Sequence, residues 1–116
     1  MLLHPMDNSK VHHMPLVLSE IRDSILLITL NSPPVNGLGL DLRQQIVDAI
    51  SYAQNDPHIL AIVITGSDKA YSGGADIKEF GTIKAVAEPH LLSVIKTIEA
   101  SKKPVIAAIQ GVCMGG

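Results

Sequence analysis

The chain has 116 residues, of which 47% are hydrophobic, and nine Lys and Arg oppose eleven Asp and Glu. This length suits one globular domain or part of a larger one, and the balanced charge offers no basic patch for duplex nucleic acid. A single cysteine excludes an internal disulfide framework, and no apolar run reaches the roughly 18 residues that span a bilayer.

Residues 1–15 are polar and punctuated by proline, and we predict that they form a loose leader before a domain at 16–116. They lack the basic and apolar regions of a signal peptide. We therefore expect a cytoplasmic location if the protein is bacterial, whereas a mitochondrial or peroxisomal location is not readable. Neither a nucleic-acid nor a membrane partner is expected.

The first structured elements are predicted to be a β-hairpin and a loop. The apolar runs "LVLSEI" and "ILLITL" flank Arg22-Asp23-Ser24, a pattern typical of two antiparallel strands joined by a turn. "NSPPVNGLG" then predicts a loop, because proline lacks an N–H and restricts the residue before it.

An amphipathic helix is predicted between Asp41 and Asn55. Apolar residues recur there at spacings of three and four, namely Leu42, Ile46, Ala49, Ile50 and Ala53. Asp41, with Gln44 three residues later, is predicted to cap the start of the helix. Pro57 is predicted to end it.

The second half of the chain alternates strands and a helix. Ile59 to Thr65, "ILAIVIT", is continuously apolar, which indicates a parallel strand buried on both faces. A second helix follows, with Pro89 in its first turn and one apolar face made by Leu91, Leu92, Ile95 and Ile98. "VIAAI" begins another buried strand. This order predicts the α/β class with right-handed crossovers. Because a final buried strand needs a covering layer, we expect an N-terminal fragment of a longer protein.

Both predicted parallel strands open into glycine-rich segments, "YSGGADIKEF" and "QGVCMGG". The dinucleotide-binding and P-loop patterns are both missing from the sequence. Ligands bind outside the carboxyl ends of strands in open α/β sheets. Two backbone N–H groups from these segments could therefore meet at one oxygen, as an oxyanion hole requires. Ordinary turns are the alternative interpretation.

"AIVITGSDKAYSGGADIKEF" with "KPVIAAIQGVCMGG" resembles the enoyl-CoA hydratase/isomerase family, the crotonases, as does "NSPPVNGLGLDLRQQIVDAI". The resemblance runs from about Leu16 to Gly116 and implies a truncated crotonase (ClpP-like) ββα spiral. It also implies that the backbone N–H groups of Ala75 and Gly116 form the oxyanion hole. The coenzyme A thioester would be bound by Ala75, Asp76, Ile77, Lys78 and Gly116. Cys113-Met114 departs from the small aliphatic pair that is usual in the family.

The function that this resemblance implies is hydration of trans-2-enoyl-CoA to 3-hydroxyacyl-CoA in fatty-acid β-oxidation. The two catalytic glutamates of the family would follow Gly116, so the chain alone is expected to be inactive. One alternative is enoyl-CoA isomerisation or other thioester enolate chemistry, and another is a non-catalytic RNA-binding protein of the same fold. The acidic balance disfavours RNA binding.

The same resemblance implies which small molecules and partners are involved. No cofactor is expected in this chain, because coenzyme A enters as the carrier of the acyl substrate. NAD would be used only if a 3-hydroxyacyl-CoA dehydrogenase part follows, as in the multifunctional members that "NSPPVN" and "AAIQGV" resemble. A monofunctional parent would form a trimer-based homo-oligomer.

Several other polar residues carry simpler interpretations. Asp76 is predicted to be a helix N-cap rather than an acid or base. Lys78 would either meet a coenzyme A phosphate or be solvated. Glu79 and Glu99 are predicted to be surface carboxylates, and Cys113 a small buried apolar residue rather than a nucleophile. The histidines are scattered, so no metal site is expected: His4, His12, His13, His58 and His90.

Overall fold

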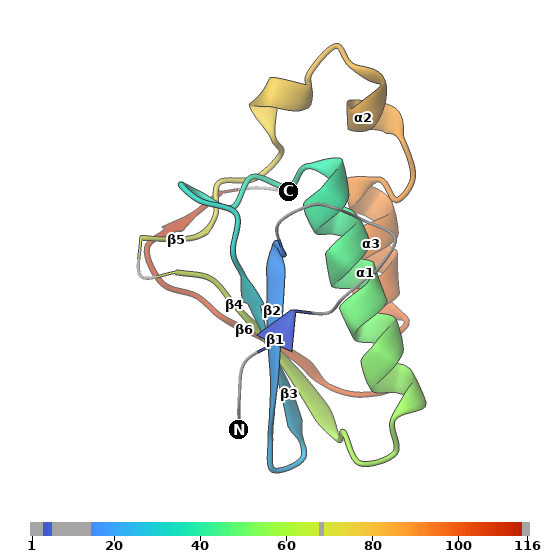
Figure 1. Cartoon of the computed structure of the whole chain (residues 1–116). Helices are drawn as coiled ribbons and strands as arrows, with labels where there is room; N and C mark the ends of the chain where they lie inside the picture. The colour runs from blue at the N-terminus through green and yellow to red at the C-terminus, as the bar shows by residue number, and fades with distance from the viewer. Residues whose placement is uncertain (1–3, 6–14, 68, 115–116) are drawn as a thin grey trace.

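The computed structural model describes residues 4–5, 15–67 and 69–114. Its elements, in chain order, are β1 (His4–Pro5), β2 (Val17–Arg22), β3 (Ile25–Leu30), α1 (Leu40–Asn55), β4 (Ala61–Thr65), β5 (Ala70–Ser72), the 3₁₀ helix η1 (Ile77–Glu79), α2 (Ile83–Val86), α3 (Leu91–Glu99), β6 (Val105–Ala108) and β7 (Val112–Cys113). One sheet has five strands in the order β1-β2-β3-β4-β6, and the other pairs β5 with β7. Figure 1 shows this arrangement along the chain.

The predicted hairpin and the predicted parallel strands are both confirmed. β2 and β3 are antiparallel, in a register that runs from Val17 opposite Leu30 to Arg22 opposite Ile25. Asp23 in the turn has a φ of 53°, a left-handed conformation that aspartate tolerates. β3, β4 and β6 are parallel, as the α/β class requires. β1, which lies inside the predicted leader, pairs with β2, and the leader residues 1–3 and 6–14 lie outside the described residues.

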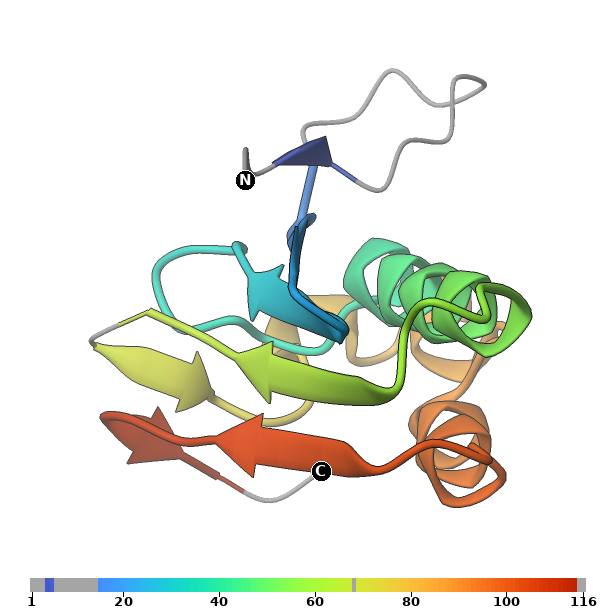
Figure 2. The same ribbon diagram turned by 90° about the horizontal axis from the view of Figure 1, so that it is seen from below.

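The buried core lies between the five-stranded sheet and the helices α1 and α3, which lie side by side on one side of that sheet (Figures 1 and 2). All five apolar residues predicted to line the inner face of α1 are buried. They join residues of the strands and of α3 in one cluster that includes Val17, Leu26, Ile28, Ile62, Ile64 and Val94. None of the helices in the described part of the chain is long and apolar enough to cross a membrane.

The predicted side-chain cap of α1 is wrong. The N-cap residue is Gly39, without a side-chain hydrogen bond, and the Leu40 N–H donates to both carboxylate oxygens of Glu79 at 3.1 Å. Gln44 donates instead to Asp48 Oδ1 at 2.9 Å. A carboxylate 39 residues later in the chain therefore takes the place that local capping chemistry suggested.

Burial of the parallel strands also differs from the prediction. In β4, Ile62 and Ile64 are buried while Ala61, Val63 and Thr65 are partly exposed, so one face is buried rather than both. The reason is that α1 and α3 lie on the same side of the sheet (Figure 2). β6 is the edge strand of that sheet, and its Ile106 is 53% exposed, so the predicted burial of β6 is wrong as well.

The apolar face predicted for α3 is only partly correct. Val94 is buried and Ile98 packs against the core cluster, whereas Leu92 and Ile95 are exposed. α3 begins at Leu91 with His90 as its N-cap, so Pro89 precedes the helix instead of lying in its first turn. Contact with α1 determines the buried face, and it is centred on Val94.

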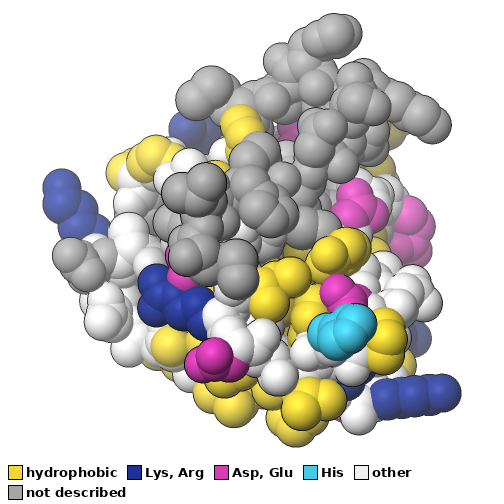
Figure 3. All heavy atoms as spheres, turned by 60° about the horizontal axis from the view of Figure 1, so that its bottom comes forward, with side chains coloured by type: hydrophobic (Ala, Val, Ile, Leu, Met, Phe, Trp, Pro, Cys, Tyr) yellow, Lys and Arg dark blue, Asp and Glu magenta, His cyan; other side chains and the backbone are white. Residues whose placement is uncertain are grey.

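Hydrophobic side chains also reach the surface at the end of the sheet where the β2–β3 turn meets the link from α1 to β4. There the Leu60 N–H donates to Ser24 O at 2.7 Å, and both Leu60 and Ile25 are exposed. Figure 3, which brings this end forward, shows hydrophobic side chains with charges of both signs scattered among them. Among the described side chains visible on this face, the positive charges form no continuous stripe.

Candidate functional site

Two loops that are far apart in the sequence are hydrogen-bonded to each other at the predicted site. One loop is 31–39, between β3 and α1, and the other is 73–76, after β5. The Gly73 N–H donates to Val35 O at 2.6 Å, and the Leu38 N–H donates to Gly74 O at 2.7 Å. Leu38 and Ala75 form a parallel bridge. The first predicted oxyanion donor therefore lies in a loop that the neighbouring loop supports along its length.

The peptide unit between Gly74 and Ala75 has a set orientation. Gly74 has a φ of 87°, a left-handed conformation that glycine adopts without strain. In a trans peptide the C=O and the next N–H point in opposite directions, so the bond from Leu38 to the Gly74 carbonyl directs the Ala75 N–H away from Leu38. Ala75 is exposed, and its N–H donates to none of the described residues. The loop thus presents a fixed N–H at the surface.

A buried polar network centred on Asn36 and Ser72 holds the loop 73–76 in place. The Asn36 amide donates to Ala70 O at 3.2 Å and to Tyr71 O at 3.0 Å, and its Oδ1 accepts from the Ser32 N–H at 2.7 Å. The Ser72 hydroxyl donates to Asn36 O at 2.9 Å and accepts from the Gly74 N–H at 3.0 Å. Each member is satisfied, so the network limits the conformations of the loop.

Sequence reasoning missed both central residues of this network, Asn36 and Ser72. The available signal for Asn36 was its place between Pro33-Pro34 and Gly37, where asparagine often adopts a left-handed turn conformation; its φ is 54°. The signal for Ser72 was only partly local, because its hydroxyl accepts the N–H of Gly74 two residues later but donates to the carbonyl of Asn36, 36 residues away.

A cavity of about 250 Å³ lies between the two loops. Its lining combines backbone, apolar side chains and one charge of each sign, from Ser32, Pro33, Pro34, Val35, Gly37, Gly73, Ala75, Asp76, Ile77 and Lys78. The structure therefore brings four of the predicted site residues, Ala75 to Lys78, to one cavity. Gly116, the other predicted donor, lies outside the described residues.

Asp76 is an N-cap, as the sequence predicted. Its Oδ1 accepts the Lys78 N–H at 3.0 Å at the start of η1. Asp76→Asn keeps an oxygen at this position, so we expect a loss of about 1 kcal/mol or less of unfolding free energy and largely unchanged turnover. Chemical denaturation and steady-state kinetics test this.

The matched control for that substitution is Asp56→Asn, because Asp56 Oδ1 accepts the His58 N–H at 2.9 Å in the same way, after the end of α1. Both variants should lose a similar, small amount of unfolding free energy, and both should keep their turnover. Loss of turnover in Asp76→Asn alone would mean that the carboxylate takes part in the chemistry.

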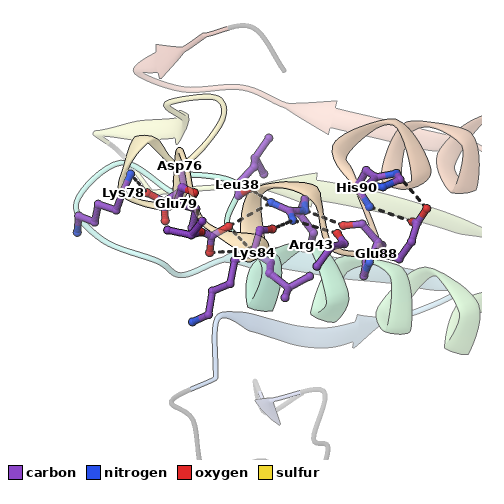
Figure 4. Close-up of polar contacts among 12 residues, drawn as sticks. Leu38, Arg43, Asp76, Lys78, Glu79, Lys84, Glu88 and His90 are labelled. Carbon is purple, nitrogen blue, oxygen red and sulfur yellow. Dashed lines mark hydrogen bonds and ion pairs between the residues drawn. The ribbon is translucent and has the colours of Figure 1, made fainter.

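Glu79 differs from its predicted role as a surface carboxylate, whereas Glu99 is exposed as predicted. The Glu79 side chain is 15% exposed and forms an ion pair with Arg43 at 3.5 Å, and the Arg43 side chain is 5% exposed. Figure 4 shows both side chains between α1 and the segment that follows Asp76. A second cavity, of about 540 Å³, is lined by Asp76, Lys78, Glu79, Thr82, Ile83 and Lys84.

The predicted burial of Cys113 is wrong. Cys113 is exposed in β7, which pairs with β5 in the small second sheet. Tyr71 lies on the neighbouring strand, and burial raises the pKa of its hydroxyl, with a further rise from the negative charge of a Cys113 thiolate. Tyr71 is therefore a neutral phenol at physiological pH.

His58 and His90 form local surface pairs rather than a cluster. His58 lies 3.3 Å from Asp56 and His90 lies 3.0 Å from Glu88. The Ser93 hydroxyl and the His90 N–H hold the pKa of Glu88 below its usual value. Within the described ranges, no three His, Cys, Asp or Glu side chains gather as metal ligands. His12 and His13 lie outside them.

Comparison with known proteins identifies similar sequences. The family model for enoyl-CoA hydratase/isomerase matches residues 20–116. The peroxisomal bifunctional enzyme of Danio rerio is 43% identical over 97 residues, which cover 83% of this chain and 13% of that protein. The glyoxysomal fatty acid beta-oxidation multifunctional protein of Cucumis sativus is 34% identical over 101 residues, covering 81% of this chain and 14% of that protein.

Solved structures are similar over most of the chain. A crystal structure of an enoyl-CoA hydratase/carnithine racemase from Magnetospirillum magneticum superposes with a TM-score of 0.79 at 32% identity. The match covers 89% of this chain and 42% of that one. The chain therefore spans less than half the length of this solved relative and about one seventh of the multifunctional ones.

Proposed function

Because the chain belongs to the enoyl-CoA hydratase/isomerase family, we propose that it forms the acyl-CoA-binding part of an enoyl-CoA hydratase. The family resemblance and the α/β crotonase fold predicted from the sequence are both confirmed. The proposed reaction adds water to trans-2-enoyl-CoA and yields 3-hydroxyacyl-CoA in fatty-acid β-oxidation. The names of the relatives, which include peroxisomal and glyoxysomal β-oxidation enzymes, support this choice of pathway.

The observation that carries the proposal is the Ala75 N–H, which the loop presents beside a cavity of about 250 Å³. When water adds to the β-carbon of the enoyl thioester, electron density moves through the conjugated system onto the thioester oxygen. A donor fixed at the position of that oxygen stabilises the charge without reorganising during the reaction. Ala75 is the proposed first donor, and Gly116 is the proposed second.

The coenzyme A moiety is proposed to lie along Ala75, Asp76, Ile77 and Lys78. Ile77 is 74% exposed and offers an apolar surface, and the neighbouring Lys78 ammonium suits a phosphate of the carrier. Coenzyme A is thus a part of the substrate, and no further cofactor is proposed for this chain. NAD is proposed to enter only if a dehydrogenase part follows in the complete polypeptide.

The decisive experiment is an assay of crotonyl-CoA hydration by the complete natural polypeptide that carries these 116 residues. The loss of the absorbance of the conjugated enoyl group measures the reaction. A parallel assay with a 3-enoyl-CoA distinguishes hydration from isomerisation, because the same oxyanion donor would serve both reactions. Hydration of crotonyl-CoA supports the proposal. Conversion of the 3-enoyl-CoA alone would assign the isomerase activity instead.

We expect the 116-residue chain by itself to show no crotonyl-CoA turnover. The carboxylates that line the described cavities are Asp76 and Glu79. Asp76 caps η1, and Glu79 is paired with Arg43, so neither is available to activate water. The acid and base are proposed to be glutamates that follow Gly116. Turnover by the purified chain above the buffer rate would overturn this expectation.

A trimer-based homo-oligomer is proposed if the complete polypeptide is monofunctional, and sedimentation analysis can measure this. The relatives include peroxisomal and glyoxysomal proteins, so the predicted cytoplasmic location holds only for a bacterial source.

A further inference from the structure

The segment 76–90, which contains η1 and α2, is attached to the rest of the protein without a hydrophobic core of its own. None of its residues is buried. Its large apolar side chains point outward, and Ile77, Phe80, Ile83 and Val86 are each more than 60% exposed. Because apolar burial is what normally fixes a segment, polar contacts must hold this one in place.

Arg43 on α1 supplies several of those contacts. Its guanidinium donates from Nε to Pro89 O and from Nη2 to Lys84 O, both at 2.7 Å. It also donates from Nη1 to Leu38 O at 2.7 Å. A guanidinium has five N–H donors in a planar fork and can therefore bind several carbonyls at once. One side chain thus joins α1 to α2, to the segment that follows α2 and to the loop 31–39 (Figure 4).

Glu79 completes the attachment from the side of the segment. Its carboxylate accepts the Leu40 N–H at the start of α1 and pairs with Arg43 at 3.5 Å. A helix N-terminus favours a negative charge. The approach is close, because a Cβ added at Gly39 would lie 2.7 Å from Glu79 Oε2. We refer to Arg43, Glu79 and these carbonyls as the Arg43 clamp.

The Arg43 clamp reaches the proposed oxyanion donor through Leu38. The Leu38 carbonyl accepts from Arg43, and the Leu38 N–H holds the Gly74 carbonyl, which belongs to the same peptide unit as the Ala75 N–H. On the other side, Glu79 directly follows Lys78, which lines the cavity. The clamp therefore reaches both ends of the Ala75–Lys78 stretch. At one end it is linked to Gly74 through Leu38, and at the other end its own Glu79 follows Lys78.

We propose that Arg43 is a positioning residue for acyl-CoA binding, because the Arg43 clamp holds segment 76–90 and the Ala75–Lys78 rim in their binding conformation. This inference rests on the proposed function of that rim. Without the clamp, the segment would have to become ordered when the ligand binds. The entropy lost in that ordering would make the binding free energy less favourable and so weaken the affinity. The residue would not touch the reacting atoms.

Arg43→Met in the complete natural polypeptide tests the proposal, since methionine retains apolar bulk on α1 and removes every donor. We expect the Kd for crotonyl-CoA, measured by calorimetry, to rise by about tenfold to a hundredfold. Backbone amides in 77–90 should exchange with solvent faster, while those of β4 should be unchanged. Arg43→Lys, which keeps the charge but loses the planar fork, should fall between wild type and Arg43→Met.

Lys103→Met is the matched control. The Lys103 ammonium donates to two backbone carbonyls at the opposite end of α1, those of Ala53 and Asp56, and it is remote from the cavity lining. This variant should lose stability as Arg43→Met does, yet its Kd should stay within about twofold of wild type. If Arg43→Met fails to fold, Glu79→Gln serves in its place, with a smaller rise in Kd expected.

The possible outcomes separate the two proposals. If wild type binds crotonyl-CoA and Arg43→Met binds it equally well, the positioning role is wrong while the proposed function stands. If Arg43→Met and Lys103→Met lose affinity for crotonyl-CoA to the same extent, Arg43 is merely structural. If wild type itself does not bind crotonyl-CoA, the proposed function fails, and the positioning role fails with it.

Discussion

Replacing Ala75 by proline is expected to lower kcat for crotonyl-CoA hydration by about a hundredfold to a thousandfold in the complete natural polypeptide. Proline removes the backbone N–H that is proposed to bind the thioester oxygen. Loss of one oxyanion donor typically raises the barrier by about 2.7–4 kcal/mol. The substitution also restricts Gly74, the residue before it, which has a φ of 87°. Steady-state kinetics with a circular dichroism check of folding measure the effect.

Ala75→Ser is the control, because serine keeps the N–H and adds one hydroxyl at an exposed position. Its kcat should fall far less than that of Ala75→Pro. Similar activity of correctly folded Ala75→Pro and wild type would mean that Gly73-Gly74-Ala75 is only a turn. An equally large loss in Ala75→Ser would point to steric obstruction of the groove rather than to the N–H.

Truncating Ile62 to alanine is expected to cost about 2–5 kcal/mol of unfolding free energy. Ile62 is fully buried in β4, where its register partners are Leu26 of β3 and Val105 of β6. Removing three carbons there leaves a cavity that the parallel sheet and the helices around it can fill only in part. Native-state hydrogen exchange of the β4 amides measures the local loss in the complete polypeptide.

Leu60→Ala provides the comparison, since Leu60 is two residues earlier in the chain and 64% exposed. It also loses three carbons, but from a side chain that is mostly in water, so we expect a change within about 0.5 kcal/mol. Equal losses in the two variants would contradict the assignment of Ile62 to the core.

Features whose causes are local could be predicted from the sequence. The spacing of the apolar residues in α1 is a property of one helix, and all five of them are buried. The hairpin follows from two runs joined by a short turn, and the register of β2 and β3 agrees with it. The Asp76 cap was predictable for the same reason, because its acceptor oxygen and the Lys78 N–H are two residues apart.

Charged residues show where local reasoning stops. Arg and Glu are rarely buried without a partner, so Glu79 was assigned to the surface and Arg43 was given no role. Their pairing joins positions 36 residues apart, and it supplies the α1 cap that Asp41 was predicted to provide. The residues next to Arg43 and Glu79 in the sequence do not indicate that these two side chains pair.

Burial depends on the tertiary structure in the same way. The apolar composition of β4 and β6 shows that these strands can be buried, but neighbouring elements decide whether they are. α1 and α3 lie on one side of the sheet (Figure 2), and β6 is its edge strand, so Val63 and Ile106 retain exposure. Cys113 is exposed because β7 pairs with the three-residue strand β5 rather than entering the core.

The site combines both kinds of information. Glycine at 73 and 74 predicted a loop after a strand, because glycine permits conformations such as the φ of 87° at Gly74. The direction of the Ala75 N–H was not readable, since it is determined by the Leu38 N–H, which binds the Gly74 carbonyl from the other loop. A loop sequence specifies which backbone angles are accessible, whereas long-range hydrogen bonds select one of them and thereby direct the donor.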